Sequence, residues 1–328
     1  MFGFGFVCGN TALLQNLRNA ITAGRVPHAS IFMGGKGLGK KLVAHSFAKV
    51  LLCTAGGTDA CGRCKSCVVF ETGNHPDFFR VKATKTKAIG VDDVREQITA
   101  RLMIRPYQSR YKIFIVENAG TLTHAAQNAL LKTIEEPAHY GIILLLCENQ
   151  KLLLPTVLSR CVLFKLVPVS TAQVAQVLAE RLGSLPEAQR QTYAAYAQGS
   201  IGRALTLCQD EDYIGMRSKT IELAAQLHNG TAENMLAYTK TFETFKENIR
   251  DMLDILYLYH RDVAAFKETG DNRFIIQKDK AQDIAVSAAN LSLATVLKKC
   301  DAIALAKKQL RQNGNFQLVV QVLLMALV

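Results

Sequence analysis

A short stretch of the chain, "GGKGLGKK", has the residue types and the spacing of a phosphate-binding loop. Gly34, Gly39 and Lys40 fit the pattern G-x-x-x-x-G-K between an apolar run and a helical pattern, and Gly37 lies inside the loop. In such a loop, backbone N–H groups at a helix N-terminus hold phosphate groups, and the lysine reaches the outer ones. The sequence therefore predicts a nucleotide-binding loop at this position. A chance glycine-rich turn is the alternative.

Three residues around this loop have the wrong chemistry for ATP hydrolysis. Lys41 stands where a serine or threonine hydroxyl normally ligates magnesium, and an ammonium group repels the metal. In "KIFIVENAG", Glu117 occupies the position of the aspartate that binds the metal, and Asn118 occupies the position of the glutamate that acts as the general base. An amide cannot accept a proton from water. We therefore expect inefficient hydrolysis here, and the sequence leaves open whether ATP or ADP still occupies the loop.

A cluster of cysteines follows in "CTAGGTDACGRCKSC". Three of them are spaced by two residues and a fourth lies a short loop away: Cys53, Cys61, Cys64 and Cys67. This spacing predicts one tetrahedral Zn²⁺ site, and four thiolates leave no open position for a catalytic water, so the zinc is expected to be structural. A redox pair or unligated thiols are the alternatives. The other cysteines are interpreted as small apolar fillers: Cys8, Cys147, Cys161, Cys208 and Cys300.

The elements that position these residues alternate between short aliphatic runs and helical patterns, which predicts a parallel sheet flanked by helices. The expected strands are 30–33, 77–81, 112–116, 142–146 and 162–165. After Pro168 only helical patterns remain. We therefore expect an α/β domain over 1–167 that contains the cysteine module 53–67, a small helical domain over 168–209 and an all-helical domain over 210–328.

Composition places further bounds on function. The 328 residues carry a formal charge of +12, which fits either solvated lysines on helix surfaces or contact with nucleic acid. The longest apolar runs are too short to cross a bilayer, and the N-terminus lacks the pattern of a secretory signal. We therefore expect a cytoplasmic protein that has no membrane span and whose cysteines stay reduced or bind metal.

Several motifs together resemble one family. "HASIFMGGKGLGKK", the four-cysteine insertion, "NHPDF", "AQNALLKTIEEPAHYGIILLLCENQKLLLPTVLSRC" and "GSIGRAL" are similar to the delta-prime family of clamp-loader subunits of bacterial DNA polymerase III, within the AAA+ class. The match is dense up to about Leu205. The resemblance implies an AAA+ domain, a helical lid and a C-terminal collar that helps to close a ring of five subunits. It also implies the partners: gamma/tau motor subunits, the delta subunit and, through the assembled ring, the sliding clamp and primer-template DNA.

The resemblance also assigns two arginines. The arginine of the "SRC" motif, here Arg160, reaches the ATP of a neighbouring subunit as an arginine finger, and Arg203 matches the lid arginine that points at a subunit's own nucleotide. A guanidinium suits the first role because it stays protonated and offers forked donors to phosphate oxygens. The alternatives are an ordinary salt bridge at a strand edge for Arg160 and a helix-surface charge for Arg203.

Taken together, the motifs predict a clamp-loader subunit that does not hydrolyse ATP itself and acts as a stator. Motor subunits of this family carry the hydroxyl after the loop lysine and an Asp-Glu pair after the strand, and both are missing here. One alternative is an active gamma/tau-like ATPase that tolerates Lys41 and Asn118. Another is a zinc-dependent nucleic-acid-binding protein, although aromatic residues do not alternate with basic ones as a base-stacking surface requires.

Overall fold

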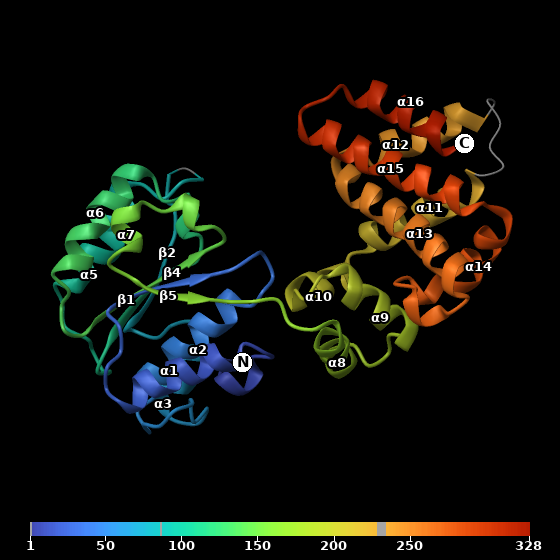
Figure 1. The fold of residues 1–328 in the computed structure, drawn as a ribbon. Helices are drawn as coiled ribbons and strands as arrows, with labels where there is room; N and C mark the ends of the chain where they lie inside the picture. The colour runs from blue at the N-terminus through green and yellow to red at the C-terminus, as the bar shows by residue number, and fades with distance from the viewer. Residues whose placement is uncertain (1, 86, 228–233) are drawn as a thin grey trace. The chain divides into compact units, whose positions relative to one another are not determined.

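The computed structural model describes residues 2–85, 87–227 and 234–328 (Figure 1). The chain folds into two compact units. The first contains Met1–Gln173 together with Gly199–Arg203, and the second contains Val174–Gln198 and Ala204–Val328. None of the described helices is long and apolar enough to span a bilayer.

A five-stranded parallel sheet forms the centre of the first unit, in the order β2-β3-β4-β1-β5. The strands are β1 (Ala29–Met33), β2 (Phe78–Val81), β3 (Lys112–Val116), β4 (Gly141–Cys147) and β5 (Val162–Lys165). The predicted sheet is confirmed, and each strand lies within one residue of its predicted bounds. Every residue of β1, β3 and β4 is buried, as expected where helices cover both faces of a parallel sheet.

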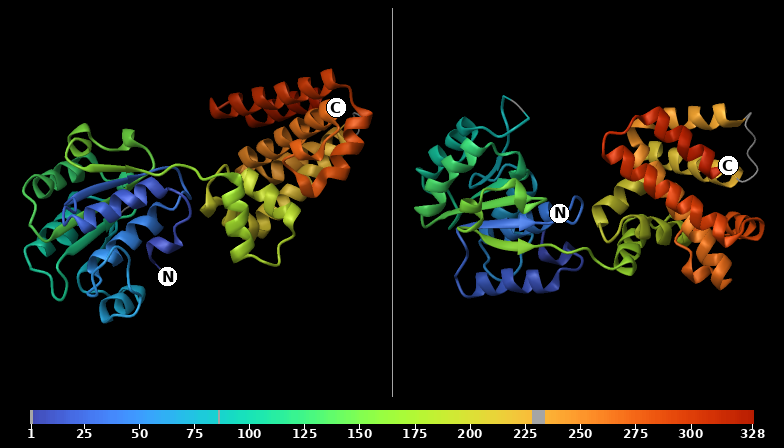
Figure 2. Two further views of the ribbon diagram at one scale, coloured as in Figure 1. Left: turned by 60° about the horizontal axis from the view of Figure 1, so that its bottom comes forward. Right: turned by 45° about the horizontal axis from the view of Figure 1, so that its top comes forward.

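Helices cover both faces of this sheet (Figures 1 and 2). One face carries α1 (Thr11–Thr22), α2 (Lys40–Leu52) and α3 (Lys65–Glu71). The other carries α4 (Val91–Val94), α5 (Ala100–Leu102), α6 (His124–Glu135) and α7 (Pro155–Leu158). Alternate strand residues point to the two sides, so Phe32 joins the first core and Ile31 the second. The result agrees with an AAA+ clamp-loader fold.

The carboxyl ends of the central strands meet at one edge of the sheet. The phosphate-loop segment follows β1, Glu117 follows β3, and the backbone N–H of Gly34 donates to the carbonyl of Cys147 at the end of β4 (3.2 Å). Ligands of open parallel sheets bind at this edge, where neighbouring strands diverge in their connections. The fold therefore brings the predicted loop and the predicted metal-binding position together.

Only helices and short 3-10 turns make up the described part of the second unit. Its helices, with α8 and α10 starting in the first unit, are α8 (Thr171–Arg181), α9 (Glu187–Tyr196), α10 (Ile201–Gln209), α11 (Glu211–Gln226), α12 (Met235–Thr244), α13 (Ile249–Thr269), α14 (Ala281–Asn290), α15 (Leu293–Arg311) and α16 (Phe316–Leu327). α13 packs against α11, α14 and α15, and α16 packs against α12 and α15 (Figure 1). The fully buried side chains of Phe242 and Tyr259 lie in this bundle.

A buried ion pair stabilises the second unit from within. Arg217 donates from both terminal nitrogens to Asp279 (2.7 and 2.8 Å), and Thr192 of α9 donates to the same carboxylate (2.9 Å). These contacts join α9 to α11 and the segment before α14. The predicted division of the helical region into 168–209 and 210–328 stays a prediction.

Candidate functional site

The phosphate-loop segment leads from β1 into α2 and requires glycine at two positions. Gly37 and Gly39 have φ angles of +79° and +90°, which glycine adopts without steric cost. A Cβ atom on Gly37 would lie 2.3 Å from Oγ of Ser200, and the N–H of Gly202 donates to the carbonyl of Gly37 (3.0 Å). The "GSIGRAL" segment therefore packs directly on the loop. Arg203 lies beside it, with its backbone N–H donating to Ser200 (3.2 Å).

The loop lysine contacts the loop itself. Nζ of Lys40 donates to the carbonyls of Gly34 (2.6 Å) and Gly35 (2.9 Å). Burial lowers the pKa of Lys40 from its usual value. A pocket of about 310 Å³ lies at the loop and is lined by Lys36, Gly37, Gly39, Lys40, Lys41, Glu117, Asn118, Leu146 and Gly202. This volume is at the small end of the range for ligand pockets.

Glu117 is held by three basic side chains. Its Oε2 accepts from Nζ of Lys41 (3.0 Å), and its Oε1 accepts from Nε2 of His45 (3.2 Å) and pairs with Nε of Arg80 (3.0 Å). The hydrogen bond from His45 is the largest cause that lowers the pKa of Glu117 to about 2, and Lys41 and Arg80 add to it against the opposing effect of burial. Both carboxylate oxygens are thus occupied by protein cations.

His45 and Arg80 were missed by the sequence reasoning. His45 is four residues after Lys41 on α2 and so lies on the same helix face, which is a signal that could have been used. Arg80 is on β2, paired with Ile115 of β3, and its approach to Glu117 depends on the order of the strands. Asn118 is exposed and lines the pocket at the loop, and its backbone carbonyl accepts from Thr121.

Arg160 lies just after α7, and its half-exposed guanidinium is already bonded to the chain. Nε pairs with Oε1 of Glu135 (2.7 Å), and Nη1 donates to the carbonyl of Thr156 (3.1 Å) and to Oγ of Ser159 (3.3 Å). The salt bridge named as an alternative therefore exists. The ion pair is formed through Nε, and the two further contacts through Nη1.

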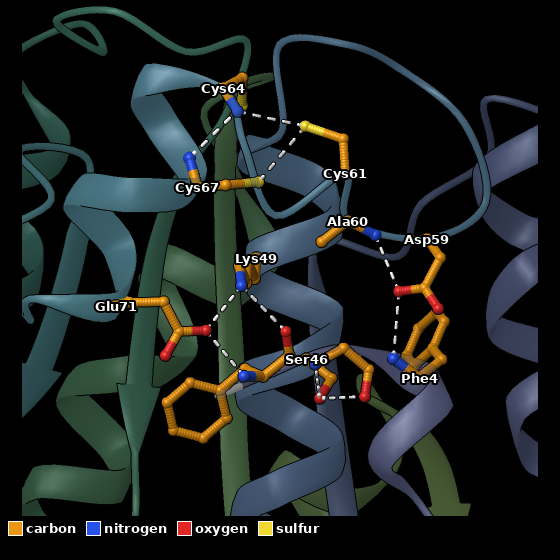
Figure 3. A network of polar contacts seen from close by, with 11 residues as sticks. Phe4, Ser46, Lys49, Asp59, Ala60, Cys61, Cys64, Cys67 and Glu71 are labelled. Carbon is orange, nitrogen blue, oxygen red and sulfur yellow. Dashed lines mark hydrogen bonds and ion pairs between the residues drawn. The ribbon is translucent and has the colours of Figure 1, made fainter.

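The four predicted cysteines converge, and their sulfurs all lie within 4.8 Å of one another. Figure 3 shows three of them, Cys61, Cys64 and Cys67. Two of the separations are 3.9 Å, between Cys53 and Cys64, and 4.0 Å, between Cys61 and Cys67. Four thiolates at about 2.3 Å from a tetrahedral zinc are separated by about 3.8 Å, so the spacing fits that ion. The cluster can hold a metal ion.

Backbone groups support the cluster. The N–H of Cys64 donates to Sγ of Cys61 and the N–H of Cys67 donates to Sγ of Cys64, both at 3.4 Å. Burial raises the pKa of the Cys64 thiol, but hydrogen bonds from Thr54 and Cys67 outweigh it and bring that pKa to about 5. Such a thiol ionises readily and is suited to ligate a metal.

The start of the chain fastens this module to α2, a feature that sequence reasoning missed. The N–H of Phe4 donates to Asp59 in the cysteine loop (3.1 Å), and Lys49 of α2 pairs with Glu71 of α3 (2.6 Å; Figure 3). The ring of Phe2 stacks on His45, with 4.9 Å between centroids. The same short segment therefore contacts both the cysteine module and the residues around Glu117.

The remaining cysteines differ in burial. Cys147 and Cys300 are buried, as expected of apolar fillers. Cys8, Cys161 and Cys208 are only partly buried. Burial raises the pKa of Cys161, the residue after Arg160, to about 11, so its thiol stays neutral near pH 7.

Comparison with known proteins gives the family. Residues 9–170 match the family described as "DNA polymerase III, delta subunit". The delta-prime subunit of DNA polymerase III from Bacillus subtilis is 29% identical over 310 residues, which cover 93% of this chain and 92% of that protein. The chain belongs to the clamp-loader family of DNA polymerase III. The predicted resemblance is thereby confirmed.

Tau and gamma subunits of DNA polymerase III match as well. The tau/gamma subunit of Haemophilus influenzae is 33% identical over 264 residues, which cover 79% of this chain but only 36% of that longer protein. Among solved structures, a DNA polymerase III gamma subunit-related protein from Thermotoga maritima matches with 17% identity and a TM-score of 0.38, over 95% of this chain and 97% of that one. Sequence similarity gives the clamp-loader family but does not distinguish the subunits within it.

Proposed function

We propose that this chain is a delta-prime-type stator of a clamp loader. It does not hydrolyse ATP, and it supplies Arg160 to the ATP site of a neighbouring subunit. Its partners are gamma/tau motor subunits and a delta subunit in a ring of five, which places a sliding clamp on primer-template DNA. Similarity to the Bacillus subtilis delta-prime subunit over nearly the whole of both chains supports this assignment over a motor subunit.

One observation carries the proposal: the carboxylate at the metal position is already neutralised by the protein. Lys41, His45 and Arg80 occupy both oxygens of Glu117, and the ammonium of Lys41 brings a positive charge to the place that a magnesium ligand would occupy. A hydrolytic site needs the metal to bridge the outer phosphates and a base to orient water. Asn118 supplies no base, so two parts of the machinery are missing independently.

Arg160 has the chemistry for action on a neighbour. Its side chain is 41% exposed, and a guanidinium keeps its charge and can form forked hydrogen bonds to a phosphoryl group. Charge develops on the phosphoryl oxygens as the bond to the leaving group breaks, and a fixed cation stabilises it. The chain would thus accelerate hydrolysis in another subunit without breaking a bond itself.

The cysteine module is proposed to bind one structural Zn²⁺ through Cys53, Cys61, Cys64 and Cys67. The sulfur separations and the four-thiolate donor set support zinc. When bound, the ion would crosslink the end of α2 to the start of α3. The residues of the module and the N-terminal segment then form one rigid part of the α/β domain.

Substitution of Arg160 in a reconstituted clamp loader tests the finger role. Arg160→Ala should lower hydrolysis at the adjoining site by about 10³- to 10⁵-fold, with assembly preserved. Arg160→Lys is the matched control, because it keeps the charge but loses the fork and should restore little activity. Single-turnover measurements resolve the affected site from the other ATP sites of the ring.

Unchanged single-turnover kinetics with Arg160→Ala would remove the finger role. The motor alternative has its own signature, which is steady hydrolysis by the purified chain that Lys40→Ala abolishes. The nucleic-acid alternative predicts tight binding of DNA by the isolated chain, with a steep dependence on salt and loss on cysteine substitution.

A further inference from the structure

The support beneath Arg160 is rigid. Gln127 of α6 is buried, and its amide donates to the carbonyl of Leu152 (3.1 Å) while its Oε1 accepts from the N–H of Leu154 (2.7 Å), the residue that caps α7. Ile134 of α6 and Val157 of α7 are buried in the same core. These contacts hold the first turn of α6 against the start of α7, and the two helices share one core as a single platform.

Glu135 is the last residue of α6 and stands at the edge of this platform. Pro137 follows two residues later, and a proline there prevents the helix from continuing. The carboxylate of Glu135 is thereby presented outside the core, and it is 46% exposed. Its Oε1 lies 2.7 Å from Nε of Arg160, which is a short charge-assisted contact.

Only some of the N–H donors of the Arg160 guanidinium are bonded within this chain. A guanidinium has five N–H donors, one on Nε and two on each terminal nitrogen. Oε1 of Glu135 forms an ion pair with Nε, and the oxygens of Thr156 and Ser159 accept from Nη1. None of the described residues accepts a hydrogen bond from Nη2. The two donors on Nη2 are those left for an incoming phosphoryl group.

We infer that Glu135 is a positioning residue for Arg160, fixing its guanidinium through Nε so that Nη2 is presented to the neighbour's ATP. This inference rests on the proposed finger role and adds a second residue to it. An arginine side chain has many rotamers. If Glu135 holds Arg160 in one rotamer before the neighbour docks, the loss of rotamer entropy does not add to the free energy of the transition state. A misplacement of about 1 Å can lower a rate by about 100-fold, so the restraint has a measurable consequence.

The test uses Glu135→Ala and Glu135→Gln in the reconstituted clamp loader, with the exposed neighbour Glu136→Gln as a matched control. Glu135→Ala removes both the charge and the acceptor that face Arg160. It should lower single-turnover kcat at the adjoining site by about tenfold, which is less than the loss of about 100-fold expected for a full misplacement of the guanidinium. Glu135→Gln keeps an acceptor for Nε and should restore most of that loss. Glu136→Gln should match the wild type.

The division between kcat and KM distinguishes positioning from a structural role. KM for ATP should stay unchanged in Glu135→Ala, because the neighbour's own loop binds the triphosphate. Assembly of the ring and the Tm of the chain should also stay unchanged. Because Glu135 is inferred to act through Arg160, Glu135→Ala should have no further effect when Arg160→Ala is already present.

A second measurement does not depend on activity. The Nε–H of Arg160 should give an NMR signal protected from exchange in the isolated chain, and Glu135→Ala should remove that protection while Glu136→Gln leaves it. An unprotected signal in the wild type would overturn the restraint itself.

The kinetic outcomes separate the two proposals. If Arg160→Ala lowers kcat but Glu135→Ala does not, the positioning role fails and the finger role stands. If Arg160→Ala has no effect, the finger role fails first. An increase of kcat in Glu135→Ala would mean that Glu135 restrains Arg160 away from the neighbour, and it would contradict the inference.

Discussion

The phosphate loop and the cysteine module lie at opposite ends of α2. They differ in whether their charged groups find partners within the protein. At the loop, the ammonium of Lys40 bonds to loop carbonyls, and Glu117 is surrounded by Lys41, His45 and Arg80. At the module, four sulfurs converge, and they contact one another and hydrogen-bond donors of neighbouring residues. At the loop, the charged groups are paired with one another within the protein. At the module, the four sulfurs are available as ligands for a metal ion.

This difference separates a site whose charges are compensated within the chain from one that lacks such compensation. A carboxylate beside protein cations needs no metal, because the charge is compensated within the chain. A set of thiolates has no such compensation and gains it only when a cation binds. The account therefore expects metal dependence at the module and metal independence at the loop. The following predictions test each side of that contrast.

The largest effect is expected at the module. Cys67→Ala removes a buried ligand, and bound zinc should fall from about one ion per chain to near none, because three thiolates hold the ion far less tightly than four. Metal analysis of the purified protein measures this. Cys300→Ala, a buried cysteine outside the cluster, is the control and should keep the ion. Full zinc content in Cys67→Ala would exclude the proposed ligand set.

The next effect concerns the closed ion network. Glu117→Gln leaves Lys41, His45 and Arg80 without their shared anion and should lower the free energy of unfolding at pH 7 by about 2 to 3 kcal/mol. The pKa of Glu117 in the folded protein, about 2, lies below its ordinary value of 4.5. Its stabilisation is therefore present above pH 4.5 and is lost as the pH falls toward 2.

Denaturant titrations of the wild type and Glu117→Gln over this pH range measure the difference. The difference in free energy of unfolding between the wild type and Glu117→Gln should become smaller as the solution becomes more acidic, because the carboxylate of Glu117 in the wild type is then protonated. Glu136→Gln, an exposed carboxylate without such partners, should follow the wild type. A gap independent of pH would mean that Glu117 does not contribute through its charge.

A smaller effect is expected from reopening the loop. Lys41→Thr restores the hydroxyl that ligates magnesium, and magnesium should then raise the affinity for ATP by about tenfold, or ~1.4 kcal/mol, which it should not do in the wild type. Hydrolysis should stay absent, because Asn118 still provides no base. Calorimetric titration with and without magnesium measures both proteins. Equal responses to magnesium would show that Lys41 does not exclude the metal.

The smallest effect concerns the contribution of the ion pair between Glu135 and Arg160 to stability. Glu135→Gln should change the free energy of unfolding by less than about 1 kcal/mol, because Glu135 and Arg160 are both largely exposed and such pairs contribute little to stability. Urea denaturation provides the value. A loss of several kcal/mol would make the pair a structural element.

Much of this architecture follows from local patterns. The aliphatic runs over Lys112–Val116 and Val162–Lys165 predicted β3 and β5 to the residue. β3 is buried throughout, as a nearly continuous apolar segment implies, whereas β5 lies at the edge of the sheet and only its Phe164 is buried. The cysteine spacing likewise predicted the convergence of four sulfurs, since all four belong to one short segment.

The parts that sequence reasoning missed depend on tertiary neighbours. Arg80 meets Glu117 only because β2 and β3 are adjacent in the sheet, and no local pattern states that order. The pairing of Glu135 with Arg160 joins two distant segments through the packing of α6 on α7. Ion pairs of this kind follow from topology, which a single sequence specifies only indirectly.

The most direct test of the central claim is the ATPase activity of the purified chain alone in the presence of magnesium. The account predicts no hydrolysis above that of Lys40→Ala, because Glu117 is neutralised within the protein and Asn118 supplies no base. Sustained hydrolysis that requires magnesium and disappears in Lys40→Ala would contradict it.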